Sequence, residues 1–303
     1  MSDSEERTGS TGLDDAPTVP ERREGERREG ERKSQAVRRA IRTELESDAS
    51  TKRARPERGP GDAVIELSHV FLAFDVPILE DVSFSAHEGE TIAVVGESGT
   101  GKSTCLKLIL RLLVPDKGTV CIDDDDITEL SFEDALKVRQ KMGMVFQGAA
   151  LFDSMTVFEN VAYPLREHTQ MTEEEIEQRV REKLEFVDLD ADRVMEQMPA
   201  ELSGGMKKRV GIARGMANNP EIMLYDEPTS GLDPLTTGTI TRLIKKLQKE
   251  LRVTSIVVTH DMRSVSKMAS KVALLHERHI VFFGDPEEMF ASEDPYIREF
   301  LGG

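Results

Sequence analysis

The chain has 303 residues, enough for one large domain or two modest ones. Its formal net charge of −17 argues against a surface that binds nucleic acid. No apolar run approaches the roughly 18 residues that span a bilayer, the N-terminus is polar, and Cys105 and Cys121 are the only cysteines. These features argue against a spanning helix, a secretory signal and a disulfide framework, and they predict a reducing cytoplasm.

Residues 1–60 differ in composition from the rest. They carry 14 basic and 14 acidic side chains, so the whole net charge comes from the later residues. That acidic charge fits either adaptation to high salt or an ordinary acidic surface. Glu21–Arg32 reads ERREGERREGER, with too little apolar surface to offset the entropy of ordering. We predict a disordered N-terminal tail; a short helix over Ser34–Glu46 is the alternative, and the basic run Arg53–Arg55 is either solvated or contacts anionic lipid.

From Ala63 onward short apolar segments predict strands. In chain order these are Ala63–Val70, Val82–Ala86, Thr91–Val95, Thr119–Ile122, Gly143–Phe146, Ile222–Tyr225, Thr254–Thr259, Lys271–Leu275 and His279–Phe283. The runs at Ile222–Tyr225 and Thr254–Thr259 are continuously apolar, as in strands buried on both faces of a parallel sheet. The last two segments predict a hairpin.

Helix signals dominate between Gly148 and Met216. Thr172–Val187 is amphipathic, with Thr172 as N-cap and three glutamates in the first turn, and Ser203 opens another helix that runs through Arg214. Near the end, Pro286–Ala291 and Pro295–Leu301 predict two short helices that begin with proline. We therefore predict an α/β domain over residues 61–303, with an inserted helical subdomain over 148–216 and a helical extension over 285–303.

The run GESGTGKST directly follows the apolar segment Thr91–Val95 and precedes a predicted helix over Cys105–Leu113. It fits the Walker A pattern, in which glycines let backbone N–H groups point at phosphate oxygens. Lys102 can reach the β- and γ-phosphates, and the Ser103 hydroxyl can bind Mg²⁺. The predicted phosphate-binding residues are Gly96, Glu97, Ser98, Gly99, Thr100, Gly101, Lys102, Ser103 and Thr104. A glycine-rich turn that binds nothing is the alternative, and the flanking strand and helix argue against it.

Two further motifs carry chemistry. Ile222–Glu227 reads IMLYDE, a buried strand that delivers Asp226 and Glu227 to its C-terminal end, where ligands bind in open α/β sheets. Asp226 can hold Mg²⁺ through its water shell, and Glu227 can polarise the attacking water; a solvated acidic turn is the alternative. Leu202–Met206 reads LSGGM and makes a second anion site at a helix N-terminus. Since one nucleotide does not need two γ-phosphate sites, this motif predicts contact with the nucleotide of a second copy in a two-fold dimer.

The order of these motifs, together with Gln147, the SGLD run Ser230–Asp233 and His260, resembles the ATP-binding cassette (ABC) family of ATPases. The resemblance covers about Ala63 to Phe283 and implies a P-loop NTPase core of mixed sheet with an antiparallel β subdomain. It implies that Phe74, or alternatively Phe71, stacks on adenine. Across the dimer it implies that Ser203 and Gly205 contact the γ-phosphate, that Gly204 belongs to the same nucleotide-binding motif, and that Asp233 bridges the two active sites. It also implies that His260 holds the γ-phosphate and attacking water, and that Gln147 senses Mg²⁺ and links to a membrane partner. The usual fifth signature residue is Gln, and Met206 stands there instead.

A narrower resemblance rests on Leu151–Gln170, LFDSMTVFENVAYPLREHTQ, together with LSGGM and the ending REFLGG. These segments resemble the MlaF-like ATPases of MCE-linked phospholipid transport systems. The resemblance implies an MlaE-like transmembrane permease, an MCE-domain lipid-binding protein and a STAS-domain accessory protein as partners. It places the chain peripherally on the cytoplasmic face of the bacterial inner membrane. Apolar area for the permease would come from Phe152, Met155, Val157, Phe158 and Tyr163, with ordinary helical-domain core as the alternative.

The resulting hypothesis is an ATPase subunit that dimerises on ATP and drives a lipid permease. Lys102, Gln147, Glu227 and His260 are the predicted catalytic residues, Ser103, Gln147 and Asp226 the predicted Mg²⁺ residues, and ATP with Mg²⁺ the predicted cofactors. Three alternatives remain: an importer ATPase for amino acids or phosphonates, a soluble cassette protein acting on ribosomes or DNA, and a degenerate structural cassette. One cassette, strong negative charge and the intact motifs argue against the last two. The departures from the Mla pattern are the long N-terminal tail, the YDEPTSGLDP loop in the general importer style, and Asp123–Asp126; they leave the cargo open.

Overall fold

A computed structural model of the chain describes residues 63–302, so that the predicted tail lies outside the described residues. The strands are, in chain order, β1 (Ala63–Ala73), β2 (Pro77–His87), β3 (Thr91–Val95), β4 (Lys117–Ile122), β5 (Asp125–Asp126), β6 (Met142–Val145), β7 (Ile222–Asp226), β8 (Thr254–Val258), β9 (Lys271–His276) and β10 (His279–Gly284). The helices are α2 (Lys102–Ile109), α3 (Phe132–Arg139), α4 (Val157–His168), α5 (Glu173–Phe186), α6 (Ala191–Val194), the 3₁₀ turn η1 (Pro199–Glu201), α7 (Gly204–Gly215), α8 (Pro234–Leu251), α9 (Met262–Met268), α10 (Pro286–Phe290) and α11 (Pro295–Leu301).

The continuous apolar segments form a central sheet of six strands in the order β10-β9-β3-β8-β7-β6. Strands β9, β3, β8, β7 and β6 run parallel, and β10 closes the edge as the antiparallel arm of the predicted hairpin. Every residue of β3 and β8 is buried, because both faces of the sheet are covered. The carboxyl ends of the parallel strands therefore share one edge, where loops can gather.

A second, antiparallel sheet has the order β2-β1-β4-β5. It packs with α2 against one face of the central sheet, which is the face that carries Ile222 and Leu224 of β7. The alternate residues Met223 and Tyr225 point to the opposite face and pack with α7, α8 and α4–α6. Strand β7 thus lies between two apolar cores, which explains why it has no polar alternation.

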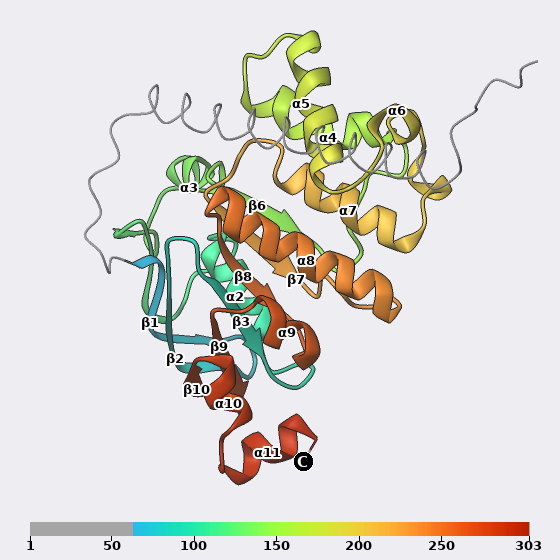
Figure 1. The fold of residues 1–303 in the computed structure, drawn as a ribbon. Helices are drawn as coiled ribbons and strands as arrows, with labels where there is room; N and C mark the ends of the chain where they lie inside the picture. The colour runs from blue at the N-terminus through green and yellow to red at the C-terminus, as the bar shows by residue number, and fades with distance from the viewer. Residues whose placement is uncertain (1–62, 303) are drawn as a thin grey trace, which may run out of the picture.

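Helices α4 to α7 form a group at the β6 side of the central sheet (Figure 1). Thr156 and Thr172 each begin a helix with a reciprocal capping box, through Glu159 and Glu175 respectively. The apolar faces of α4, α5 and α7 share one core with the central sheet. These features confirm the predicted fold class, an α/β P-loop core with an antiparallel part and an inserted helical part.

Several predicted boundaries were wrong. Strands β1 and β2 extend to Ala73 and from Pro77, because they pair along most of their length in one long hairpin. The helix predicted over Cys105–Leu113 begins at Lys102, capped by Gly101, and its last regular residue is Ile109. Arg111 has a φ of 53°, a left-handed conformation that cannot continue the helix.

Two remaining features complete the fold. Helices α10 and α11 begin at Pro286 and Pro295 as predicted, and their apolar residues Met289 and Ile297 pack under α9 and β9. Among residues 63–302, no helix has the length and apolar character needed to cross a membrane.

Candidate active site

The predicted phosphate loop lies between β3 and α2, at the carboxyl edge of the central sheet. Gly96 has a φ of 149°, and a Cβ there would lie 2.2 Å from the Leu275 carbonyl oxygen of β9. Gly101 has a φ of 103° and caps α2, with a Cβ position 3.1 Å from the Ile78 carbonyl oxygen. Side chains at these two positions would force the loop open, so the glycines keep backbone N–H groups close to an anion at the start of α2.

Lys102 lies inside the loop. Its side chain is buried, and Nζ donates hydrogen bonds of 2.9 Å to the Gly96 carbonyl and 2.6 Å to the Glu97 carbonyl. Burial lowers the pKa of the Lys102 ammonium, and the carboxylates of Glu227 and Asp226 oppose that shift. A cation held here by carbonyl dipoles is available to a phosphate oxygen at short range.

Ser103 and Asp226 meet at the same edge. The Ser103 hydroxyl donates a hydrogen bond of 2.8 Å to Oδ1 of Asp226, which is the last residue of β7. A hydroxyl and a carboxylate are hard oxygen ligands of the kind that Mg²⁺ binds together with phosphate oxygens. The donor set therefore fits Mg²⁺, with Ser103 and Asp226 as the residues that would hold it.

Glu227 follows β7 with a φ of 48°, so its backbone is in the left-handed region. Its N–H donates to the Val258 carbonyl at 2.9 Å, which holds it to the neighbouring strand β8. Nδ1 of His260 lies 3.0 Å from Oε1 of Glu227. The other oxygen, Oε2, also lies 3.0 Å from Nδ1 of His260, as an ion-pair contact, and it is buried with no hydrogen-bond partner among residues 63–302. A buried carboxylate that has spare acceptor capacity beside a histidine is suited to accept a proton from a bound water.

Gln147 lies after β6, and among the described residues its side chain bonds to the SGLD run and not to the predicted Mg²⁺ residues Ser103 and Asp226. Its Nε2 donates a hydrogen bond of 3.3 Å to the Ser230 hydroxyl, in the SGLD run. No hydrogen bond joins Gln147 to Ser103 or Asp226 in the described part of the chain. The predicted role of Gln147 toward Mg²⁺ stays a prediction.

The LSGGM motif lies apart from the phosphate loop. The Ser203 hydroxyl caps α7 by accepting from the Met206 N–H at 3.3 Å, and a Cβ at Gly205 would lie 2.4 Å from Thr236. Asp233 caps α8 and accepts from the Thr236 N–H at 3.1 Å, so both motifs converge on Thr236. Within residues 63–302, no hydrogen bond links Ser203, Gly204 or Gly205 to residues 96–104.

Phe74 and Phe71 differ in environment. Phe74 lies in the turn between β1 and β2 with 63% of its surface exposed. The ring of Phe71 is partly buried on β1, with Nζ of Lys117 5.9 Å from its centroid. An adenine-stacking ring needs a free face, and Phe74 is the more exposed of the two; the stacking role stays a prediction.

Sequence reasoning missed Lys208 of α7. Its side chain is buried, and Nζ donates to the carbonyls of Gln147 and Glu227, at 3.3 Å for the latter. In sequence Lys208 belongs to the basic run KKR, which reads as a solvated face. Only its spacing from Gly211 and Gly215, on one side of the helix, hints at a buried position.

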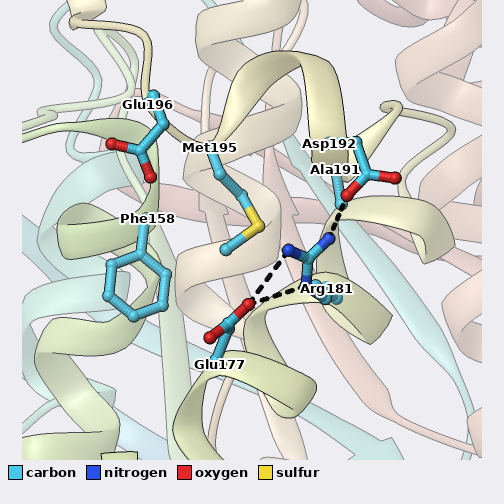
Figure 2. A pocket seen from close by; sticks show the side chains of 7 residues that line it. All are labelled: Phe158, Glu177, Arg181, Ala191, Asp192, Met195 and Glu196. Carbon is cyan, nitrogen blue, oxygen red and sulfur yellow. Dashed lines mark hydrogen bonds and ion pairs between the residues drawn. The ribbon is translucent and has the colours of Figure 1, made fainter. Parts of the chain in front are cut away.

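A cavity of about 200 Å³ lies in the helical group, away from this edge (Figure 2). Ion pairs of Arg181 with Glu177 and Asp192 cross its rim. Its lining residues are Phe158, Glu177, Arg181, Ala191, Asp192, Met195 and Glu196. None of these belongs to the phosphate loop or to the Asp226–Glu227 pair, so this cavity is separate from the nucleotide site.

The fold and the convergence of Lys102, Ser103, Asp226 and Glu227 define a P-loop ATPase of the cassette type. The sequence profile of the family described as ABC transporter matches residues 79–230. The chain belongs to the ABC transporter family, as an ATP-binding and ATP-hydrolysing subunit.

Named relatives support this assignment. The chain is 40% identical over 252 residues to the probable ribonucleotide transport ATP-binding protein mkl of Mycobacterium tuberculosis, covering 83% of this chain and 70% of mkl. It is 41% identical over 226 residues to the intermembrane phospholipid transport system ATP-binding protein MlaF of Escherichia coli K12, covering 75% and 83%. For MlaF of Haemophilus influenzae the identity is 39% over 241 residues, covering 79% and 90%. The resemblance to MlaF-like ATPases is therefore confirmed.

Solved structures of ABC cassettes are similar to this chain in fold and sequence. The dimeric, post-hydrolysis cassette MJ0796 bound to ADP and Pi superposes with a TM-score of 0.68 and 35% identity, covering 73% of this chain and 98% of that one. The cbiO1 subunit from Clostridium perfringens, part of the cbiONQ transporter complex, gives a TM-score of 0.71 and 30% identity, covering 79% and 94%.

Proposed function

We propose that this chain is the ATPase subunit of a phospholipid transporter, and that it dimerises on ATP to drive a membrane permease. The evidence for phospholipid as the transported molecule is the 41% identity to MlaF, a protein named for intermembrane phospholipid transport. Asp123–Asp126 lie in the β4–β5 hairpin, and none of them is among the nucleotide-site residues described above.

ATP hydrolysis would proceed by positioning and charge stabilisation. Lys102 and the loop N–H groups bind the β- and γ-phosphates. Ser103 and Asp226 would hold Mg²⁺, with Gln147 as the further predicted contact, and the ion would supply positive charge to the phosphates. The Glu227 carboxylate would accept the proton of the attacking water, while His260, 3.0 Å from both carboxylate oxygens, would orient Glu227 and contact the γ-phosphate.

The nucleotide site would be completed by a second copy. Ser203 and Gly205 present a helix N-terminus, yet they do not meet the phosphate loop of their own chain. In a two-fold dimer this helix end faces the γ-phosphate bound by the partner, and Asp233 lies between the two sites. The dimeric form of MJ0796 supports this arrangement for a related cassette.

The permease would dock on the surface formed by Phe152 and Tyr163. Their rings lie 5.2 Å apart between centroids, and they are 43% and 41% exposed. Val157 is fully buried, and Phe158 is partly buried against the same core, so core packing explains these two predicted contacts better than docking does. Met155 is intermediate in exposure and follows Phe152 by three residues in the chain.

The remaining partners follow from the family resemblance. An MCE-domain lipid-binding protein would accept or supply the lipid beyond the permease, and a STAS-domain protein would accompany the ATPase. Docking on the permease would place the chain peripherally at the cytoplasmic face of the inner membrane.

The experiment is co-purification from membranes followed by an ATPase assay of the complex in phospholipid vesicles. The expected result is a permease with an MCE-domain protein, and ATP turnover that phospholipid stimulates several-fold. Recovery of a permease without any lipid-binding component, or turnover indifferent to phospholipid, would contradict the lipid cargo.

A second candidate cargo comes from mkl, which is named for ribonucleotide transport and is similar over 83% of this chain. The same complex can be tested with ribonucleotides other than ATP as transport substrates. Stimulation by these compounds and not by phospholipid would favour the second candidate.

A further inference from the structure

One face of α7 holds the loop that follows β6. Lys208 donates to the Gln147 carbonyl, and a Cβ at Gly211 would lie 3.2 Å from the Cβ of Ala149. Arg214 donates to the Ala149 carbonyl at 2.9 Å and to the Ala150 carbonyl at 2.8 Å. These contacts are spaced three residues apart and therefore lie along one side of the helix.

The held loop is strained. Ala149 and Ala150 have φ values of 62° and 48°, which a side chain with Cβ disfavours. Such a conformation persists only where surrounding contacts fix it, and α7 supplies several of them. The loop is thus tied to α7 at Gln147, Ala149 and Ala150, immediately before the exposed ring of Phe152.

Lys208 also reaches the catalytic edge. Its Nζ lies 3.3 Å from the Glu227 carbonyl oxygen, which also accepts from the Ser230 N–H at 3.2 Å. Only 6% of Lys208 is exposed, and burial lowers the pKa of its ammonium while the carboxylates of Glu227 and Asp226 oppose the shift. A buried cation is costly, so apolar packing alone does not account for lysine at this position.

Glu227 needs restraint from more than one direction. Its φ of 48° is left-handed, and its N–H is fixed to β8 through the Val258 carbonyl. The hydrogen bond from Lys208 fixes the opposite side of the same residue, at its carbonyl. A shift of about 1 Å in a catalytic group can cost on the order of a hundredfold in rate, so such a restraint has kinetic weight.

We propose that Lys208 is a positioning residue, which fixes the backbone of Glu227 to the loop after β6 and so keeps the Glu227 carboxylate aligned for hydrolysis. Among residues 63–302 it makes no hydrogen bond to the phosphate loop, and it acts through Glu227 and Gln147. A movement of that loop would then reach Glu227 through one side chain. The inference rests on the proposed role of Glu227 as the group that accepts the water proton.

The first test compares Lys208→Met, Lys208→Arg and a control in the full-length protein. Methionine keeps the length of the side chain and removes the charged donor, so kcat per ATP-binding dimer should fall at least about tenfold while KM for ATP changes less than about twofold. Arginine keeps donors and charge and should recover most of kcat. The control is Lys246→Met, since Lys246 also donates to a carbonyl, that of Phe186, at 2.6 Å but away from the site.

Unchanged kcat in Lys208→Met, or an equal loss in Lys246→Met, would overturn the proposal. A parallel rise in KM would also overturn it, because it would place Lys208 in nucleotide binding. If Lys208→Met yields no folded protein, Lys208→Gln takes its place. The same fall in kcat with little change in KM is expected, since glutamine is too short to reach both carbonyls.

A double-mutant cycle separates this inference from the proposed role of Glu227. Single-turnover hydrolysis is measured for Glu227→Gln with and without Lys208→Met. If Lys208 acts through Glu227, its loss should matter less than about twofold once the carboxylate is gone. An undiminished tenfold loss in the Glu227→Gln background would overturn the positioning role alone. Near-normal turnover by Glu227→Gln itself would instead overturn the role of Glu227.

Discussion

The hydroxyl of Ser103 donates a hydrogen bond of 2.8 Å to the carboxylate of Asp226, although 123 residues separate them in the chain. One belongs to the helix after β3 and the other ends β7, with β8 between those strands. The fold therefore brings together the two oxygens that would bind Mg²⁺, which is the basis of the first prediction.

Asp226→Asn should raise the Mg²⁺ concentration needed for half-maximal ATP hydrolysis at least about tenfold, because an amide oxygen lacks the charge that holds a hard cation. The measurement is a Mg²⁺ titration of steady-state turnover. Asp134→Asn, an exposed carboxylate that pairs with Lys137 on α3, serves as control and should keep the parental midpoint. Equal midpoints for both variants would contradict a metal role for Asp226.

Lys102→Ala should weaken ATP binding at least about tenfold, which is about 1.4 kcal/mol, because the cation inside the phosphate loop is lost. Binding is measured by fluorescence titration with an ATP analogue. Lys107 lies exposed on the same helix, so Lys107→Ala should bind like the parent. Unchanged affinity in Lys102→Ala would count against Lys102 as the phosphate ligand.

Glu227→Gln should bind ATP with parental affinity and lose about 10²- to 10⁴-fold in turnover, since the phosphate cradle stays intact while the proton acceptor is removed. The ATP-bound dimer should then accumulate, which size-exclusion chromatography with and without ATP and Mg²⁺ can detect. A variant that stays monomeric with bound ATP would speak against the proposed dimer.

Phe152→Ser should reduce recovery of the permease with the tagged ATPase at least about fivefold, because it removes an exposed aromatic anchor from the proposed docking surface. Phe290→Ser offers a matched control, since Phe290 is 44% exposed on α10, next to the C-terminal helix α11 (Figure 1). Quantitative mass spectrometry of the membrane pull-down gives the ratio. Equal recovery for the two variants would place the docking surface elsewhere.

The two thiols should differ in reactivity. Burial raises the pKa of Cys105 to about 12, whereas Cys121 is only partly buried, with its pKa raised by burial and by Asp126. A raised pKa means less of the reactive thiolate at a given pH, so Cys121 should react slowly near neutrality and faster as the pH rises, while burial shields Cys105 in the folded protein. Intact-mass analysis with a maleimide should show labelling of Cys121 alone until denaturant is added. Labelling of Cys105 in the native protein would contradict its burial.

Much of the fold was predictable from local pattern. Thr91–Val95 matches β3 residue for residue, because a continuous apolar run between a turn and a glycine loop has few other conformations open to it. Thr172 caps α5 as predicted, since N-capping depends on neighbours within four residues. Helices α3, α8 and α9 were not among the predicted elements, although their N-caps Ser131, Asp233 and Asp261 follow the local capping pattern. The end of α2 was missed because a left-handed Arg111 has no compositional signal.

The sequence by itself determined the chemistry of the phosphate loop. Glycine spacing, Lys102 and Ser103 act over a few residues of chain, so short-range geometry is enough to define them. It also determined that Asp226 ends a buried strand and that Glu227 follows it, because strand and loop are adjacent in the chain.

Only the tertiary structure decided which distant residues touch. The contact of Ser103 with Asp226, of His260 with Glu227, and of Lys208 with both Gln147 and Glu227 depends on strand order and on the packing of α7. Strand order is set by burial of two apolar faces over the whole domain, which no local window contains. A local window also does not show where the anion site indicated by the motif at Ser203 lies. The fold places this motif away from the phosphate loop of its own chain.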